Sequence, residues 1–192
     1  MTKRELIMDA AASLFAEKGF YAATVEEIAD RAGIGKSTVY EYFPSKEHLF
    51  RETLKGGLES YMEAMKGRLK QPCSVRDVLT AIGTAHFNFI QKRTSAARIL
   101  AGENSSQSPW ADELLLQLRE RRITMFSSLL SQGIERGEFR RVDSRAAAEV
   151  FLGVLGVLCM PVLRGGEDDK KGAAERFYHG IDIFFSGILD QE

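Results

Sequence analysis

The chain has 192 residues, of which 28% are charged and 44% hydrophobic, and it contains only four prolines. These values are typical of a folded protein of one or two domains, and they exclude a disordered or fibrous chain. The formal net charge is −1, so any nucleic-acid site must be a local arrangement of a few cations rather than a property of the whole molecule.

The cysteines and the apolar segments indicate a cytoplasmic protein. Cys73 and Cys159 are the two cysteines, and their separation fits neither a disulfide framework nor a four-ligand zinc site. The N-terminus lacks the apolar stretch of a signal peptide. The longest uncharged run, Val150 to Leu163, has 14 residues and includes Pro161, which is short of the roughly 20 apolar residues that span a bilayer. It predicts a buried helix, and no membrane association is expected.

The spacing of the apolar residues predicts an all-helical chain. They recur every three or four positions, without the sustained alternation of strands. The first helix is predicted from Lys3 to Lys18, with Gly19 at its end. Its buried face is expected to contain Leu6, Ala10 and Leu14, with Ile7 and Ala11 as further candidates.

Two short helices follow. Thr24 is a good N-cap, because Glu27 lies three residues later and completes a capping box. This helix is predicted to end near Ala32. Gly33-Ile34-Gly35 then makes a tight turn, and the next helix runs from Lys36 to Tyr42.

The rest of the chain is predicted to consist of longer helices. Pro44 stops the third helix and Ser45 caps a fourth, which continues to about Leu69. Pro72-Cys73-Ser74 is the clearest break, and Ser108-Pro109 is a helix start. The later helices are predicted at 75–92, 94–102, 109–136, 144–164 and 172–189.

The two short helices have the features of a helix-turn-helix. Such a pair needs a small residue where the second helix packs against the first, and Ala29 provides it. Gly33 lies where the backbone must turn, and Val39 is expected to point inward with Ile28 and Ile34. The small residue, the glycine turn and the inward apolar residues therefore all fit a helix-turn-helix within one short segment.

Four segments carry a resemblance to a known family. They are AAASLFAEKGF at 10–20, TVEEIA at 24–29, GIGKSTVY at 33–40 and YFPSKE at 42–47. On these the chain resembles the TetR family of one-component repressors, closely over about its first 50 residues. The resemblance implies an all-α fold with a three-helix DNA-binding head (1–46) and a helical ligand-binding and dimerisation domain (47–192). It also implies a dimer on double-stranded operator DNA with two-fold symmetry.

The predicted DNA contacts lie on and around the helix at 36–42. Residues near the start of a recognition helix enter the major groove, so Lys36, Ser37 and Thr38 are expected to reach base edges. The full predicted set is Thr24, Gly35, Lys36, Ser37, Thr38, Tyr40, Tyr42 and Lys46. In this set Thr24 and Lys46 are assigned to phosphates. Tyr40 and Tyr42 can reach phosphates or pack against the groove wall, and one of them can instead be a core residue.

Two positions depart from the family pattern. Gly35 stands where a serine is common, and Glu41 stands where an aromatic residue or histidine often touches the DNA backbone. A carboxylate is repelled by phosphate, so no contact is predicted for Glu41.

The same residues also fit other interpretations. Gly35-Lys36-Ser37 resembles the end of a P-loop, but Asp30 stands where that motif needs glycine. A helical hairpin that binds no DNA is the plain alternative for 24–43. The rival function is a helical enzyme or carrier for a lipid-like substrate, although no catalytic arrangement stands out at local spacing.

No cofactor or metal is predicted. His48, His86 and His179 lie too far apart to form a local metal pair. The run Arg119-Glu120-Arg121-Arg122 is interpreted as a solvated helix face.

The last two predicted helices are apolar on more than one face, so they are expected to form a homodimer interface. Phe184 and Leu155 are the predicted interface positions, with Gly153, Gly156, Gly180 and Gly187 allowing close approach.

A small, uncharged or weakly polar hydrophobic inducer is predicted to bind in the C-terminal domain. Met and aromatic side chains recur there at helical spacing, and such side chains adapt to apolar ligands. No charged residue interrupts these stripes of apolar residues at a plainly inward position, which disfavours a strongly charged ligand. The same stripes equally fit a plain core. The candidate ligand-binding residues are Tyr61, Met65, Phe87, Ile90, Trp110, Leu114, Leu118, Met125, Phe126, Phe151 and Met160.

Overall fold

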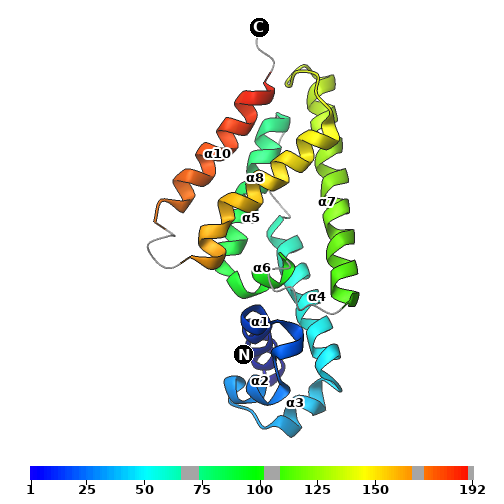
Figure 1. The fold of residues 1–192 in the computed structure, drawn as a ribbon, viewed down its shortest axis with the longest axis vertical. Helices are drawn as coiled ribbons and strands as arrows, with labels where there is room; N and C mark the ends of the chain where they lie inside the picture. Colours follow the sequence, from blue (N-terminus) through cyan, green and yellow to red (C-terminus); the bar gives the residue numbers. More distant parts are fainter. Residues whose placement is uncertain (66–73, 102–108, 166–170, 190–192) are drawn as a thin grey trace. The chain divides into compact units, whose positions relative to one another are not determined.

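The computed structural model describes residues 1–65, 74–101, 109–165 and 171–189, and every regular element in these ranges is an α-helix (Figure 1). The helices are α1 (Lys3–Ala22), α2 (Val25–Ala32), α3 (Lys36–Tyr42), α4 (Lys46–Met65), α5 (Val75–Lys92), α6 (Thr94–Leu100), α7 (Pro109–Glu135), α8 (Ser144–Arg164) and α10 (Ala173–Ile188). An isolated β-bridge joins Phe139 to Leu189. The all-helical prediction is therefore confirmed. The predicted helix end near Leu69, the break at 72–73 and the Ser108 cap lie outside the described residues.

Packing divides the chain into two compact units. Unit 1 comprises Met1–Glu63 and Arg93–Leu116, and unit 2 comprises Ala64–Lys92 and Gln117–Glu192. Unit 1 therefore contains α1 to α3, most of α4, α6 and the first turns of α7. The predicted division of function between 1–46 and 47–192 concerns roles rather than packing, and it stays a prediction.

Gly19 interrupts α1 near its end. It has φ 77° and ψ 173°, a conformation that glycine adopts without steric cost, and a last helical turn follows it to Ala22. The buried face of the helix contains Ile7, Ala10, Ala11 and Leu14. Leu6 is exposed, so its predicted place in the core is wrong: Ile7, Ala11 and Leu14 keep the i, i+4, i+7 spacing and turn the neighbouring position outward.

The turn between α2 and α3 has the predicted geometry. Gly33 is left-handed, with φ 66°, and its amide donates to the carbonyl of Asp30 at 3.1 Å, while the amide of Ile34 donates to the carbonyl of Ala29 at 3.0 Å. Ala29 and Val39 are both buried. The two helices thus pack against each other on small and branched side chains, as a helix-turn-helix requires.

The core of unit 1 holds this pair against α1 and α4. The Phe50 ring of α4 lies 4.8 Å from Phe15 and 5.0 Å from Phe20, centroid to centroid. On the surface, Arg31 of α2 donates to both carboxylate oxygens of Glu17 of α1, at 2.6 and 2.8 Å. Ser45 accepts a hydrogen bond from the amide of His48 at 3.0 Å, which fits its predicted role as the cap of α4.

Unit 2 is built around α8, which packs against α5 and α10; Figure 1 shows it crossing α5. The Phe151 ring lies 5.2 Å from Phe126 of α7 and 5.0 Å from Phe184 of α10, so one side chain joins three helices. Gly180 of α10 lies close to α8, because a side chain there would meet the side chain of Leu158, which would have to shift.

One described helix meets the length and composition of a membrane span. In α8 the most apolar 18-residue window has a mean hydropathy of 2.2, and 39% of that window is buried. The core helix of a soluble protein meets the same test, which is therefore weak evidence for a span. The exposed residues of α8 include the large apolar side chains Val150, Val157 and Met160.

Candidate functional site

The outward face of α3 carries most of the predicted DNA contacts. Lys36, Ser37, Tyr40 and Tyr42 are exposed and Thr38 is half-buried. Val39 and the following Phe43 are 1% exposed and anchor the helix in the core of unit 1. Gly35 precedes α3 in an extended conformation, without a side-chain cap. The helix therefore presents a short polar and aromatic face on a fixed base.

A hollow of about 420 Å³ lies beside this face. It is lined by Tyr21, Ala23, Thr24, Val25, Glu26, Lys36, Tyr40 and Lys46. Four predicted residues are thus brought together, whereas Gly35, Ser37, Thr38 and Tyr42 lie outside its lining. Tyr21 and Glu26 were missed by the sequence reasoning. The extra helical turn after Gly19 brings Tyr21 here, and no local pattern marks that turn.

Lys36 forms an ion pair with Glu26 in this hollow. Its ammonium nitrogen lies 3.1 Å from a carboxylate oxygen of Glu26, and both side chains are largely exposed. The hydrogen bond from Lys36 to Glu26 raises the pKa of the lysine, so Lys36 is a cation at neutral pH. Since an exposed pair of this kind is weak, a phosphate or a base edge can replace Glu26.

Thr24 is committed to capping α2. Its hydroxyl accepts from the amide of Glu27 at 3.2 Å, and the Glu27 carboxylate accepts from the amide of Thr24 at 3.1 Å, which completes the predicted capping box. Glu27 also pairs with Lys18 of α1. The hydrogen bonds from Lys18, then those from Thr24, lower the pKa of Glu27 from 4.5 to about 2.

This depressed pKa predicts an acid-sensitive contribution of Glu27 to stability. A group with a lowered folded-state pKa stabilises the fold above its unfolded value, and the contribution is lost as the pH falls from about 4.5 toward 2. Glu27→Gln keeps the cap but loses the charge. We expect it to lower the urea midpoint near neutral pH, with the difference from wild type shrinking toward about pH 3.

Glu41→Gln is the matched control, because Glu41 of α3 is exposed and makes no hydrogen bond or ion pair among the described residues. A Glu27→Gln difference that stays constant over the same pH range would contradict the role given to the carboxylate.

Lys46 is held by the protein itself. Its ammonium group donates to the carbonyls of Tyr21 and Ala23, at 3.2 and 3.0 Å, and it lies 4.7 Å from the centre of the Phe20 ring. Desolvation lowers the pKa of Lys46. The ammonium has three donors, so one remains for a phosphate, while the other two fix the end of α1 against α4.

The predicted ligand-binding residues do not form one group in the described structure. Tyr61, Trp110 and Leu114 belong to unit 1, where Trp110 stacks on Arg51 at 4.5 Å. In unit 2, Phe87, Ile90, Phe126 and Phe151 are buried, Leu118 is half-buried, and Met125 and Met160 are exposed. Met65 belongs to unit 2 by sequence, but its side chain lies outside the description.

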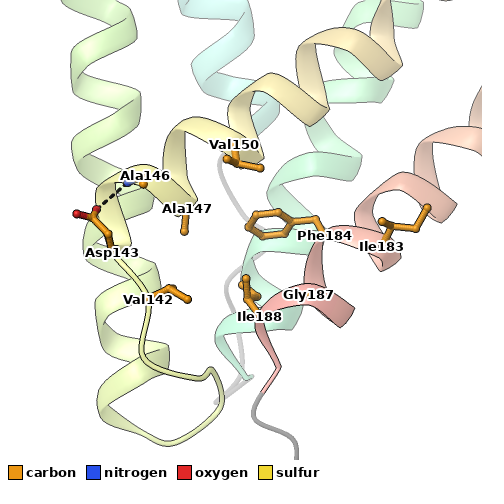
Figure 2. Close-up of a pocket in the computed structure, with 9 residues that line it drawn as sticks. All are labelled: Val142, Asp143, Ala146, Ala147, Val150, Ile183, Phe184, Gly187 and Ile188. Atoms are coloured by element: carbon orange, nitrogen blue, oxygen red, sulfur yellow. Dashed lines mark hydrogen bonds between the residues drawn. The ribbon is translucent and has the colours of Figure 1, made fainter.

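An apolar surface runs along α8 and α10. Val157 is 71% exposed and Ile183 is 74% exposed. Among the described residues, and apart from the nearby backbone of the same helix, no atom lies within 4 Å of the space that a side chain would fill at Gly153, Gly156 or Gly187. A hollow of about 380 Å³ lies between the two helices. Figure 2 shows Val150 of α8 on one side of it and Ile183 and Phe184 of α10 on the other.

The predicted interface positions Leu155 and Phe184 need correction. They are 1% and 8% exposed and fill the core of unit 2, so a charge at either would disturb folding before association. Val150, Val157 and Ile183 are among the apolar residues of α8 and α10 that face outward.

Among the described residues, no group of three or more histidine, cysteine, aspartate or glutamate side chains could hold a metal ion. Cys159 is buried, as its place in the apolar run predicted.

Comparison with known proteins gives matches over both parts of the chain. Residues 7–53 match the family model of bacterial regulatory proteins, tetR family, and residues 72–179 match that of the tetracyclin repressor-like C-terminal domain. The transcriptional repressor KstR2 of Rhodococcus jostii is 32% identical over 143 residues, covering 72% of this chain and 68% of its own.

Two further relatives extend the comparison. The fatty acid metabolism regulator protein of Bacillus subtilis is 24% identical over 150 residues, covering 78% of this chain and 77% of its own. The crystal structure of AibR in complex with isovaleryl coenzyme A and operator DNA shares the fold, with a TM-score of 0.79 at 17% identity, covering 96% of this chain and 98% of its own.

Proposed function

Because the chain belongs to the TetR family of bacterial regulatory proteins, we propose that it represses transcription as a cytoplasmic dimer bound to a two-fold operator, and that a small hydrophobic ligand releases it. The observation that carries DNA binding is the hollow beside α3, where Lys36, Tyr40, Thr24 and Lys46 meet on one surface. Cations and hydroxyls on an exposed two-turn helix suit a major groove.

The residues of this surface take different roles. Lys36, at the start of α3, reaches base edges together with Ser37 and Thr38. Tyr40 and Tyr42 contact phosphates. Lys46 mainly sets the position of α1 against α4 through the two carbonyls that it contacts, and Thr24 fixes the start of α2.

These roles predict different effects on DNA recognition. Lys36→Ala should change which base is preferred at one operator position, by about 1–3 kcal/mol. Tyr40→Ala should weaken binding to all duplexes about equally. The measurement is selection of bound sequences from random duplex DNA, followed by titration of the selected duplex at several salt concentrations, because phosphate contacts give an affinity that falls with salt.

Two variants sharpen this test. Glu26→Gln frees Lys36 from its ion pair and should raise DNA affinity without changing the selected sequence. Lys55→Ala is the control for loss of charge, since Lys55 is exposed on α4 and does not line the hollow. If Lys36→Ala left both the affinity and the selected sequence unchanged, its assignment to base readout would be wrong.

The dimer is proposed to form through the apolar surface of α8 and α10. Val150, Val157 and Ile183 are large apolar side chains on the surface of these two helices. Monomeric proteins expose single apolar side chains, but they rarely expose a contiguous apolar patch. Pairing α8 and α10 with their copies in an isologous bundle covers both the hollow and the open glycines.

The ligand is proposed to bind in unit 2. The support is the aromatic interior formed by Phe87, Phe126 and Phe151 and the nature of the relatives, one of which is named for fatty acid metabolism and another of which was solved with an acyl coenzyme A. A ligand that prefers one arrangement of the helices shifts the dimer toward a head spacing that no longer fits two successive major grooves.

The rival reading, an enzyme or carrier, gains no support from the relatives, which are named as regulators.

A further inference from the structure

Arg122 of α7 lies in an unusual environment for an arginine. The run Arg119-Glu120-Arg121-Arg122 was expected to be a solvated face, and its first three residues are exposed. Arg122 is half-buried, and its Nε atom is sealed from solvent without a hydrogen-bond acceptor among the residues that the structure describes. The prediction is therefore wrong for this one residue, which α7 turns toward the interior of unit 2.

The charge of this guanidinium affects the pKa values of two polar side chains on other helices. Desolvation, and then the charge of Arg122, lower the pKa of His86 of α5 to about 3. Desolvation raises the pKa of Cys159 of α8 to about 12, against the opposing influence of Arg122. At neutral pH both are uncharged. We call these three residues the Arg122 cluster, and within it the charge resides on Arg122.

The cluster lacks a counter-ion. No hydrogen bond or ion pair joins Arg122 to an Asp or Glu side chain among the described residues. Buried apolar residues stand near each member of the cluster in sequence: Ile123 and Phe126 on α7, Phe87 on α5 and Leu155 on α8. A donor sealed in such surroundings without an acceptor destabilises the fold, and sites of this kind in native structures call for an explanation.

We propose that the Arg122 cluster binds the head group of the ligand, and that the ligand is an apolar chain that ends in a carboxylate. A carboxylate supplies both the missing acceptor and the missing negative charge, and it pairs with guanidinium in a planar, charge-assisted geometry. The aromatic residues of unit 2 then surround the apolar chain. This inference rests on the proposed ligand site in unit 2 and names the chemistry of its ligand.

The cluster revises the expectation of an uncharged inducer. That expectation assumed that no charged residue points inward from the apolar stripes, and Arg122, four residues after Leu118 and four before Phe126, does so. A neutral alcohol or ester could satisfy the Nε donor but would leave the charge uncompensated.

The test compares ligands that share a ten-carbon chain and differ in the head group. Decanoate, methyl decanoate, decanol and decanoyl coenzyme A are titrated against the full-length wild type, Arg122→Met and Arg121→Met. Binding is followed by calorimetry, by the rise in melting temperature and by release of the selected operator duplex. Arg121→Met is the matched control, since Arg121 is the exposed neighbour on the same helix.

We expect decanoate to bind the wild type and Arg121→Met alike, and to bind Arg122→Met about tenfold to a hundredfold more weakly, as loss of a charge-assisted pair predicts. The ester and the alcohol should bind weakly and respond little to either substitution. Without ligand, Arg122→Met should melt at the same or a higher temperature than wild type, because it removes the sealed Nε donor and keeps an apolar stem that reaches about as far as Nε.

Other outcomes separate this inference from the proposed function. Equal binding of ester and carboxylate, or equal response of wild type and Arg122→Met, would overturn the carboxylate assignment and leave an apolar inducer in place. Binding of the coenzyme A thioester without binding of decanoate would also overturn it. If none of the four compounds bound or released the operator, the carboxylate assignment would fail and the proposed apolar inducer would lose its support as well.

Discussion

Replacing Val157 by aspartate is expected to split the dimer and to weaken operator binding at least about a hundredfold. Val157 lies on the outward face of α8 with little contact to its own protomer. In an isologous interface the substitution places two carboxylates in one apolar contact, and each loses hydration without gaining a partner. A cost of several kcal/mol is typical of an unpaired buried charge, and a hundredfold corresponds to about 2.7 kcal/mol.

Sedimentation of the variant at several concentrations gives its association state, and circular dichroism shows whether the helices are retained. Ile183→Asp, at an exposed apolar position of α10, should behave in the same way. Leu116→Asp is the control, because Leu116 is a comparably exposed apolar residue on α7. An intact dimer in both Val157→Asp and Ile183→Asp would place the interface elsewhere on the molecule.

The proposed dimer surface shows what the spacing of apolar residues can and cannot predict. The apolar run of α8 predicted a helix with apolar residues on more than one face, and this pattern is present: Leu155 is buried, and Val157, two residues later, is exposed and apolar. That a partner covers the exposed face stays a prediction. Periodicity cannot tell which of two apolar faces meets the protomer's own helices. That choice depends on α5 and α10, which lie far away in sequence, and so Leu155 and Phe184 were assigned to the wrong side.

The head was predictable in more detail because its signals are local. The capping box of Thr24 and Glu27 starts α2, Gly33 ends it and Pro44 follows α3. Each helix boundary is therefore determined by residues within a few positions of it. The surroundings of the DNA-contacting side chains are not local. Glu26 reaches Lys36 across the turn, and the carbonyls of Tyr21 and Ala23 hold Lys46 from a helix more than twenty residues earlier.

Arg122 escaped prediction for the same reason. Its own neighbours in sequence are charged, and a run of arginine and glutamate is most often solvated. Only the packing of α5 and α8 against α7 shows that one of the four side chains has its Nε sealed from water.

Replacing Ala29 by leucine is expected to abolish DNA binding while leaving the dimer intact. Ala29 is 2% exposed, and α2 packs against both α1 and α3. Three added carbon atoms cannot be accommodated in a well-packed core without displacing one of these helices, and overpacking of this kind costs about 1–3 kcal/mol. Because α3 has only seven residues, it depends on this packing for its position, and a small displacement removes its contacts with base edges.

The same substitution at an exposed site provides the control. Ala101 follows α6 in unit 1 and is exposed, so Ala101→Leu should retain operator affinity and melting temperature. For Ala29→Leu we expect loss of the gel shift at concentrations that saturate wild type, with an unchanged sedimentation coefficient, since unit 2 carries the proposed dimer surface. Operator binding by Ala29→Leu at wild-type affinity would mean that α2 and α3 are not packed as a helix-turn-helix reader. Loss of the dimer together with DNA binding would mean that association depends on unit 1, contrary to the surface assigned to α8 and α10.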